Sequence, residues 1–318
     1  MFDIVILTDN RYINPKNIDW YTEQVLLEDK ILQDSLENIG LVVCRKDWAD
    51  KKFNWAHTKC AIFRSTWDYF ERFEEFFSWI EETKNKIRFI NATEIIKWNI
   101  NKRYLIELKN KGVNIASTLF INNDNPRTLD SLFKETNWNE AVIKPAISGA
   151  ARHTYKITPA TCKDYEVIFK QLISQESMLF QEFLNNIILK GEISVIMIAG
   201  KYTHAIIKTA KKGDFRVQDD HGGIVRKYVP LKEEILFAEQ CINIINPCPL
   251  YARVDIVYDN KDKVSLSELE LIEPELWFRD NPKSAEFLAE EIKNYLTDSK
   301  DMSNSISSSI ALSPKSLK

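Results

Sequence analysis

The sequence has no long apolar run, no paired cysteines and little net charge. No segment reaches the roughly 18 apolar residues that span a membrane, and the apolar run at 2–7 is too short for a signal peptide and lacks a basic flank. The five cysteines form no Cys-x-x-Cys pair, which disfavours a disulfide framework or zinc site. A net charge of -3 disfavours a nucleic-acid or membrane partner. We therefore expect a cytoplasmic protein with reduced thiols.

The composition is that of a folded globular chain. Hydrophobic residues make up 44% and charged residues 28%, with 17 Phe and 8 Trp, which excludes a disordered protein. A chain of 318 residues exceeds the usual single-domain size, so two or three packed units are expected.

The first 92 residues alternate between short apolar runs and helical patterns. Strands are predicted at 2–7, 41–44, 60–63 and 89–91, and helices at 20–38 and 70–84. This alternation predicts a small parallel α/β domain over 1–92.

The pattern changes from residue 93 onward. For 93–178 we predict a helix over 102–111, a strand over 117–121, a short helix and a strand over 141–144. For 179–296 we predict strands at 179–183, 192–198 and 201–208, a helix at 231–245, a hairpin at 251–271 and a helix at 282–296. The fold class is thus α/β (α+β), with helices backing an antiparallel sheet. The Ser-rich segment 297–318 is expected to be a disordered tail.

Carboxylates crowd the predicted hairpin. Glu268 and Glu270 alternate with apolar residues and share one strand face. If the loop holds an even number of residues, as 259–262 does, Asp255 joins that face and three oxygen ligands converge, which suits Mg²⁺. The alternative is an exposed acidic edge that resists aggregation, but the interleaved apolar residues favour a site.

A small-residue run follows the strand at 141–144. Lys144 stands at its entrance, and backbone N–H groups around Ser148 and Gly149 can approach an anion. The run fits no P-loop pattern, and an ordinary surface turn is the alternative.

A linker between two predicted strands is suited to a nucleoside. Main-chain groups of such a linker can bind a base, and Glu192, which opens the next strand, can accept both ribose hydroxyls. The linker residues concerned are Gln181, Glu182, Phe183 and Leu184. A plain strand connection is the alternative.

Basic residues and a glycine pair follow. Lys208 and Arg216 are candidate cations, with a solvated basic loop as the alternative for the lysines. Gly222 and Gly223 allow close approach of a ligand. Arg253 shares the face of Asp255, where a buried arginine needs an anionic partner such as phosphate or a substrate carboxylate.

In this order the elements resemble the ATP-grasp superfamily of carboxylate-amine ligases, which includes D-alanine:D-alanine ligase and glutathione synthetase. The most specific match is Arg253-Val254-Asp255 followed by Glu268-Leu269-Glu270. The family usually has Asn where this chain has Glu270. The segments at 63–69, 98–102 and 268–274 look most like the branch of the D-cycloserine-forming ligase.

The resemblance implies a function and assigns roles. An N-terminal pre-ATP-grasp domain (1–92) would bind substrate, and subdomains 93–178 and 179–296 would enclose ATP. Lys102 and Lys144 would contact phosphates, 181–184 would form the adenine hinge, and Glu192 would hold the ribose. Asp255, Glu268 and Glu270 would bind Mg²⁺, with two ions expected and Mn²⁺ as an alternative. Arg216 and Arg253, with Lys208, would stabilise the transferring phosphoryl group.

The expected enzyme is thus an ATP-dependent ligase that forms an amide through an acyl phosphate, releasing ADP and phosphate. Its substrate would be a small, amino-acid-like molecule, and Arg64, which follows a buried strand, is a candidate for its carboxylate. An ion pair between Arg64 and Asp68 is the alternative. A nucleotide-binding regulator without ligase activity, an intramolecular (cyclising) reaction and a homodimer are left open.

Overall fold

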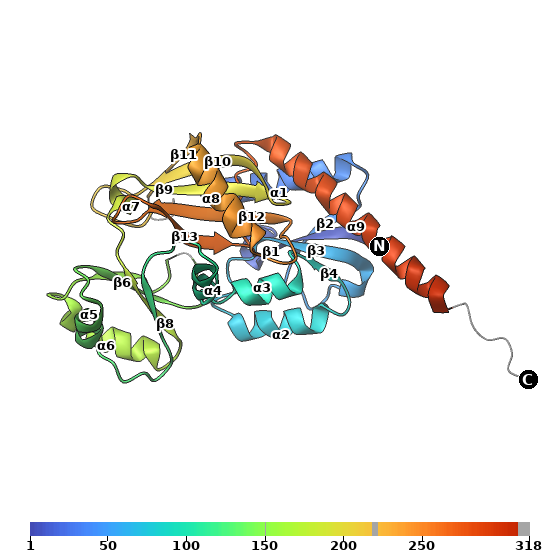
Figure 1. The fold of residues 1–318 in the computed structure, drawn as a ribbon. Helices are drawn as coiled ribbons and strands as arrows, with labels where there is room; N and C mark the ends of the chain where they lie inside the picture. Colours follow the sequence, from blue (N-terminus) through green and yellow to red (C-terminus); the bar gives the residue numbers. More distant parts are fainter. Residues whose placement is uncertain (150, 218–221, 311–318) are drawn as a thin grey trace, which may run out of the picture.

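Three β-sheets organise the computed structural model, which describes residues 1–149, 151–217 and 222–310, with side chains described up to residue 297. The first sheet has the order β2-β1-β3-β4, the second β5-β8-β6-β7, and the third β11-β10-β9-β12-β13. The second sheet lies apart from the other two, at the lower left of Figure 1. Helices cover the sheets, so the predicted mixture of parallel and antiparallel α/β units is confirmed.

The first sheet is parallel throughout. It comprises β1 (Phe2–Thr8), β2 (Val43–Asp47), β3 (Thr58–Ser65) and β4 (Arg88–Ile90), with α1 (Trp20–Asn38), α2 (Phe73–Thr83) and the 3-10 helices η1 (Asn10–Tyr12) and η2 (Trp55–His57) between them. Consecutive residues of β1 are fully buried because both sheet faces are covered.

In this region the structure confirms one predicted helix and shifts one predicted strand. The predicted helix at 20–38 is confirmed, and its first turn is capped by Asp19, whose side chain accepts from the Thr22 N–H. The strand predicted at 41–44 begins later, at Val43, because the Leu41 N–H still bonds the carbonyl of Leu36 at the end of the helix.

The second sheet is antiparallel and carries helices on one side. It comprises β5 (Thr118–Ile121), β6 (Ala141–Pro145), β7 (Tyr155–Ile157) and β8 (Met178–Glu182), covered by α5 (Leu129–Thr136) and α6 (Cys162–Ile173). Two short helices, α3 (Thr93–Asn99) and α4 (Tyr104–Asn110), connect it to the first sheet. Its core of aromatic and aliphatic residues is separate from the cores of the other sheets.

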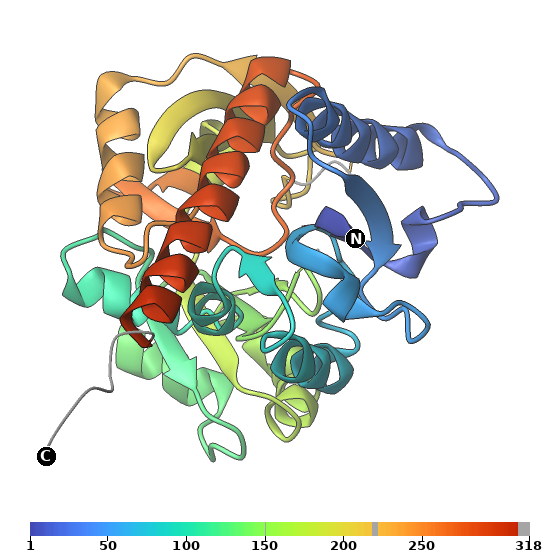
Figure 2. The same ribbon diagram turned by 90° about the vertical axis from the view of Figure 1, so that its right-hand side faces the viewer.

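The third sheet is also antiparallel. It comprises β9 (Glu192–Ile198), β10 (Lys201–Thr209), β11 (Ile224–Tyr228), β12 (Tyr251–Tyr258) and β13 (Val264–Glu270), with α7 (Asn186–Leu189) before it and α8 (Lys232–Asn243) against one face. The last helix, α9 (Pro282–Ile310), packs against α1, and Figure 2 shows it crossing the molecule.

The last helix is longer than predicted. The helical backbone of α9 runs past residue 296, the predicted end, to Ile310. Residues 311–318 lie outside the described chain. Within the described part, no helix is both long enough and apolar enough to cross a membrane.

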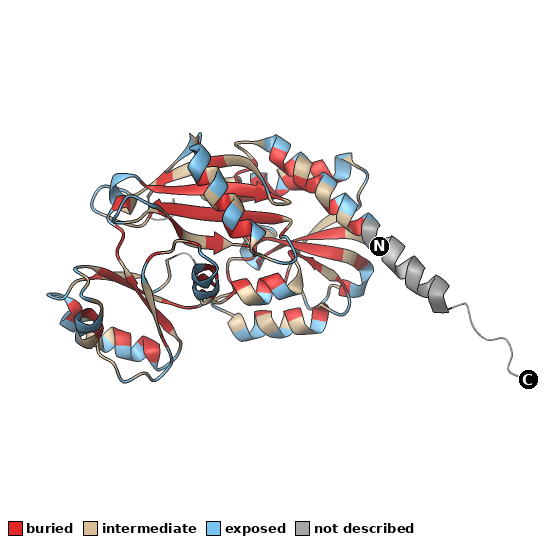
Figure 3. Cartoon of the chain, in the orientation of Figure 1, coloured by how far each residue is buried: buried red, intermediate tan, exposed pale blue. Residues whose placement is uncertain are grey.

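One face of the third sheet changes character along its length. Ile196 and Ile198 of β9 and Tyr251 of β12 are buried in a core shared with the first sheet and α9. Farther along the same face stand Ser194 and Asp255, at paired positions of the two strands. Figure 3 shows these strands as largely buried. The two-residue period of the strands thus joins an apolar core to a row of polar side chains.

Candidate functional site

A cavity of about 420 Å³ gathers most of the predicted site residues. Residues of the second and third sheets line it, together with segments that follow strands of the first sheet. The predicted residues in its lining are Lys102, Lys144, Ser148, Gly149, Gln181, Glu182, Phe183, Leu184, Glu192, Lys208, Arg216, Arg253, Glu268 and Glu270. Asp255 lies behind this lining and is only 2% exposed. Arg64, Gly222 and Gly223 are not part of the lining.

A β-bulge sets the face of the carboxylates. The connection between β12 and β13 is 259–263, one residue longer than predicted, and this odd number alone would place Asp255 and Glu268 on opposite faces. The register shifts beside Asp255, so that Ser267 is the extra residue. Asp255 then pairs with Glu268, and Arg253 with Glu270. The predicted shared face is therefore correct, although the predicted loop length is wrong.

Arg253 separates two of the three carboxylates. Its Nε and Nη2 donate to Asp255 at 2.9–3.1 Å, and its Nη2 also donates to Glu270. Asp255 further accepts from the Ser194 hydroxyl at 2.5 Å and lies 3.5 Å from the Lys208 ammonium. Burial opposes ionisation of Asp255, but Arg253 and Lys208 outweigh it and hold its pKa below the usual value.

The structure does not show the predicted convergence of Asp255, Glu268 and Glu270 on one point. Among the described residues, no group of three His, Cys, Asp or Glu side chains is placed to hold a metal ion. The reason is that each of these carboxylates already contacts a cationic side chain.

Even so, the donor set fits a divalent cation. Glu268 and Glu270 present oxygen atoms to the cavity, with side chains 30% and 28% exposed. Burial raises the pKa of Glu270 to about 7, and the negative charges of Asp255 and Glu268 add to the rise. The nearby Arg253 does not offset these effects. A cation bound between these oxygen atoms would offset the repulsion among the carboxylates, so the donors suit a divalent ion.

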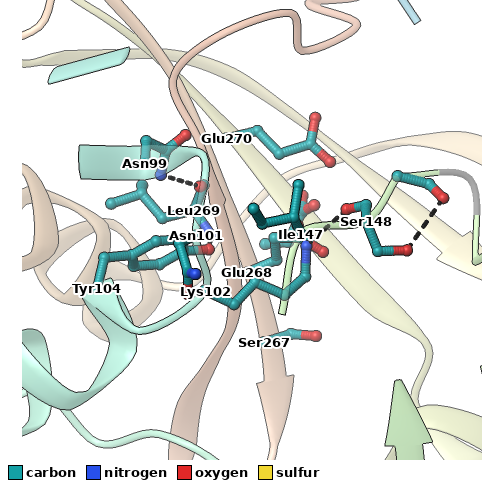
Figure 4. Close-up of polar contacts among 12 residues, drawn as sticks. Asn99, Asn101, Lys102, Tyr104, Ile147, Ser148, Ser267, Glu268, Leu269 and Glu270 are labelled. Atoms are coloured by element: carbon teal, nitrogen blue, oxygen red, sulfur yellow. Dashed lines mark hydrogen bonds and ion pairs between the residues drawn. The ribbon is translucent and has the colours of Figure 1, made fainter. Parts of the chain in front are cut away.

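Lys102 connects the carboxylate hairpin to the small-residue run. Its ammonium lies 2.7 Å from Glu268 and donates to the carbonyl of Ser148 at 2.8 Å, and Figure 4 shows it between the two segments. The residue precedes α4 rather than lying within a helix as predicted. Lys144 also lines the cavity, and burial lowers its pKa. Both lysines can therefore meet an anion placed between the hairpin and this run.

Helices α3 and α4 fix the position of β13. Asn99 donates to the carbonyl of Leu269 at 2.8 Å and accepts from the Leu271 N–H at 2.9 Å. The Tyr104 hydroxyl accepts from the Leu269 N–H at 2.9 Å. The edge of the hairpin is thus bonded to side chains instead of to another strand, which holds the alternate residues Glu268 and Glu270 toward the cavity.

The predicted hinge forms the apolar end of the cavity. The Phe183 ring meets Phe215 edge-on at 5.7 Å, and Lys156 lies 3.8 Å above it. The N–H groups of Glu182 and Phe183 bond neighbouring backbone carbonyls, whereas in the described chain the Leu184 N–H has no hydrogen-bond partner. An uncommitted N–H beside apolar walls can donate to a ring nitrogen of a flat heterocycle.

Glu192 and Lys208 form a buried pair at the cavity wall. The two charged groups are 2.5 Å apart, and the Ser267 hydroxyl donates to the second oxygen of Glu192 at 3.0 Å. The acidic neighbours Asp255 and Glu192 outweigh the effect of burial and raise the pKa of Lys208. A solvated basic loop is therefore excluded for Lys208, whereas Lys211 and Lys212 are exposed as that alternative expected.

The structure also places the less central candidates. Arg216 lines the cavity and pairs with Asp214 at 2.7 Å. Arg64 is 3% exposed and its guanidinium lies 5.4 Å from the ring centre of Phe278. Among the described residues its Nε and Nη1 have no hydrogen-bond partner, and the alternative pairing with Asp68 is wrong, since Asp68 pairs with Arg72 at 2.7 Å instead.

Several lining residues escaped the sequence reasoning. Arg11 follows β1, and its guanidinium donates to the carboxylate of the fully buried Asp9 at 2.6–3.1 Å. The Trp67 indole donates to the carbonyl of Glu273 at 3.0 Å, and burial, followed by the charge of Glu270, raises the pKa of the Glu273 side chain to about 8. The available signal was the position of Asp9 and Arg11 after a parallel strand, where α/β sheets present ligands.

Known proteins are similar to this chain in sequence and in fold. Residues 4–91 match the family described as D-cycloserine synthetase DcsG, N-terminal domain. The cycloserine biosynthesis protein DcsG of Streptomyces lavendulae is 24% identical over 259 residues, which cover 77% of this chain and 86% of that protein. A crystal structure of D-cycloserine synthetase DcsG matches with a TM-score of 0.78 at 20% identity, covering 91% of this chain and 99% of that one.

A structure of the ATP-grasp ligase PsnB with a minimal precursor, Mg and ADP matches with a TM-score of 0.59 at 13% identity, covering 92% of this chain and 98% of that one. The predicted fold and resemblance are thereby confirmed: the chain has the ATP-grasp fold and is similar to the ligases of the D-cycloserine synthetase branch.

Proposed function

We propose that this chain is an ATP-dependent carboxylate-amine ligase that forms an amide on a small, amino-acid-like substrate. One observation carries the proposal. A single cavity has an apolar end with an open backbone N–H and, at its other end, buried lysines and an arginine beside carboxylates. This arrangement suits a nucleoside triphosphate, whose base is flat and whose phosphates concentrate charge.

Each part of the cavity would have its own task. The hinge at 181–184 would hold adenine and Glu192 the ribose, while Lys102, Lys144 and the backbone at Ser148 and Gly149 would neutralise phosphate charge. Lys208, Arg216 and Arg253 would stabilise charge on the phosphoryl group as it moves to a substrate carboxylate. An amine would then displace phosphate from the acyl phosphate. Gly222 and Gly223 lie outside the lining, so they would have to move toward the cavity to contact a ligand.

Asp255, Glu268 and Glu270 are the residues that would hold Mg²⁺, and Mn²⁺ suits the same donors. A divalent cation would neutralise phosphate oxygens there. For that, Asp255 and Glu270 must exchange part of their bonding to Arg253, which would free the guanidinium for the substrate. The structure of PsnB with Mg and ADP supports this proposal by likeness of fold.

The N-terminal region would form the end of the cavity that receives the substrate. The division of the chain into domains at residues 92 and 178 is part of this proposal. Arg11, fixed by Asp9, and the aromatic side chains of Tyr12 and Trp67 line this end. They could receive the carboxylate and body of an amino acid. Arg64 would reach the substrate only if the wall at Trp67 moved. Whether the amine belongs to the same molecule, as in a cyclisation, depends on the substrate.

The test is ADP release from Mg-ATP with a panel of D- and L-amino acids and hydroxy acids. Stimulated release, with hydroxamate formed when hydroxylamine replaces the amine, would support the ligase and its acyl phosphate. Nucleotide binding without stimulated release by any panel member would instead favour a regulator that keeps the fold without the chemistry.

A further inference from the structure

The turn between β12 and β13 is hydrogen-bonded to the hinge. In Figure 1 the turn ends of both strands point toward α7, which follows the hinge. Asn260, in this turn, donates through Nδ2 to the carbonyl of Phe183 at 3.0 Å and to the Glu182 carboxylate at 3.1 Å. Its Oδ1 accepts from the Asn185 N–H at 2.9 Å. The amide nitrogen of Asn260 therefore bonds the hinge, and its amide oxygen bonds the residue that follows the hinge.

The turn itself is rigidly closed. The Asp259 carboxylate accepts from the N–H groups of Lys261 and Lys263 at 2.8 and 3.0 Å, and the Asp259 N–H donates to the carbonyl of Lys263 at 2.8 Å. Asn114 donates to the Asp259 side chain at 3.0 Å. Because the turn is braced internally, the amide of Asn260 is held in place before it meets the hinge.

Further bonds tie the turn to α7. Asn186 donates to the Asp259 carbonyl at 2.7 Å and to the Asp262 carboxylate at 3.0 Å, and Lys190 lies 2.8 Å from Asp262. The hinge thus has two kinds of contact. Its residues 181–184 line the cavity, and Glu182 and Phe183 are also hydrogen-bonded to Asn260 of the turn.

The same hairpin carries Asp255, Glu268 and Glu270 in its strands. We infer that Asn260 is a positioning residue for the nucleotide: it fixes the hinge backbone against the carboxylate hairpin and so sets the placement of the base relative to the phosphate end of the cavity. This inference rests on the proposed ATP site. Asn260 itself does not line the cavity, so it acts through the hinge.

The test compares Asn260→Ala and Asn260→Asp with the wild type in the full chain. Asn260→Ala removes the bonds from Nδ2 and Oδ1, whereas Asn260→Asp keeps the size but places a carboxylate against the Phe183 carbonyl and Glu182. Lys261→Ala is the matched control, because it is exposed in the same turn and its side chain has no hydrogen bond or ion pair among the described residues. Calorimetry would give the dissociation constants of Mg-AMPPNP and of Mg-tripolyphosphate, which has no base.

We expect both Asn260 variants to bind Mg-AMPPNP roughly threefold to tenfold more weakly, since about 1 kcal/mol per hydrogen bond corresponds to about fivefold. Tripolyphosphate binding should change little, and Lys261→Ala should match the wild type. Wild-type affinity of both variants for Mg-AMPPNP would overturn the inference, as would an equal loss for both ligands. A wild-type protein that binds no Mg-AMPPNP would instead refute the proposed function.

Discussion

At the scale of single residues, the site depends on how buried carboxylates are neutralised. Glu268 contacts Lys102 at 2.7 Å, and Lys102 and Lys144 are the leading causes that hold the Glu268 pKa below its usual value against burial. Glu270 shares Arg253 with Asp255, and its pKa is raised. The pKa values of two acidic residues on one strand face are therefore shifted in opposite directions, because the lysines beside Glu268 outweigh its burial whereas Arg253 does not outweigh the burial of Glu270.

Glu268→Gln should reduce ATP turnover to below about 1% of wild type. The amide keeps the shape of the side chain and can still accept a hydrogen bond from Lys102, but it lacks the charge that a divalent cation requires. Far-UV circular dichroism should be unchanged. The control is Glu233→Gln, which alters an exposed residue of α8. Turnover near the wild-type level in Glu268→Gln would refute the metal assignment.

The raised pKa values predict how stability depends on pH. The folded-state values of about 7 for Glu270 and about 8 for Glu273 lie above the ordinary 4.5. Between these limits the folded protein binds more protons than the unfolded chain, so the free energy of unfolding should fall as pH rises from about 5 to 8. We expect a fall of at least about 2 kcal/mol from these groups.

Urea titrations across this pH range would measure the effect. Glu270→Gln and Glu273→Gln should each flatten the fall, because the amide cannot ionise. Added Mg²⁺ should also flatten it, by favouring the charged form of Glu270. A pH dependence that is unchanged in both variants would contradict the assignment to these residues.

At the scale of elements, Gly191 sets the start of β9. Its φ is +79°, and a Cβ at this position would lie 2.5 Å from the carbonyl oxygen of Lys208. Gly191→Ala would therefore combine backbone strain with a clash against β10, next to the pair of Glu192 and Lys208. We expect a loss of at least about 2 kcal/mol in the free energy of unfolding.

Gly213→Ala provides the matched comparison. Gly213 also has a positive φ, +90°, but a Cβ there would meet no atom of the described residues within 4 Å. Only backbone strain of about 1 kcal/mol should result. Chemical denaturation of the two variants separates the strain from the clash, and equal losses would show that the contact with Lys208 has no weight.

The hairpin also shows how far the sequence predicts an element. Alternation correctly placed Glu268 and Glu270 on one face, because the two-residue period of a strand follows from local geometry. Asp255 shares that face only because a bulge compensates for a connection one residue longer than predicted. The extra residue of the turn and the compensating bulge at Ser267 leave no mark in the residue pattern. The environment of Arg64 was also hidden, because the choice between Asp68 and Phe278 depends on contacts distant in sequence. The sequence therefore predicts faces better than partners.

At the scale of the whole molecule, the first and third sheets form one packed body. Residues of both sheets share a core with α1 and α9. Glu28 of α1 is 4% exposed and accepts from the N–H groups of Phe278 and Arg279 at 3.0 and 3.1 Å. The segments after the first-sheet strands that line the cavity are thereby fixed relative to the carboxylate hairpin, whereas the second sheet has its own core.

Asn91 joins the first and third sheets through buried hydrogen bonds. It is 1% exposed, follows β4 of the first sheet, and donates to the carbonyls of Tyr251 and Leu271 at 2.9 and 2.8 Å while accepting from the Leu250 N–H at 2.7 Å. Asn91→Ala would leave these buried backbone groups without partners. We expect the free energy of unfolding to fall by about 3 kcal/mol or more.

Because the two sheets share a core, they should still unfold together in Asn91→Ala. Urea unfolding followed by tryptophan fluorescence and by circular dichroism should therefore give coincident curves at a lower midpoint. Asn139→Ala, which alters an exposed asparagine beside the second sheet, should stay within about 0.5 kcal/mol of the wild type. Separate transitions for the two probes, or an unchanged midpoint, would mean that the sheets are stable independently and that the cavity wall is free to move against the hairpin.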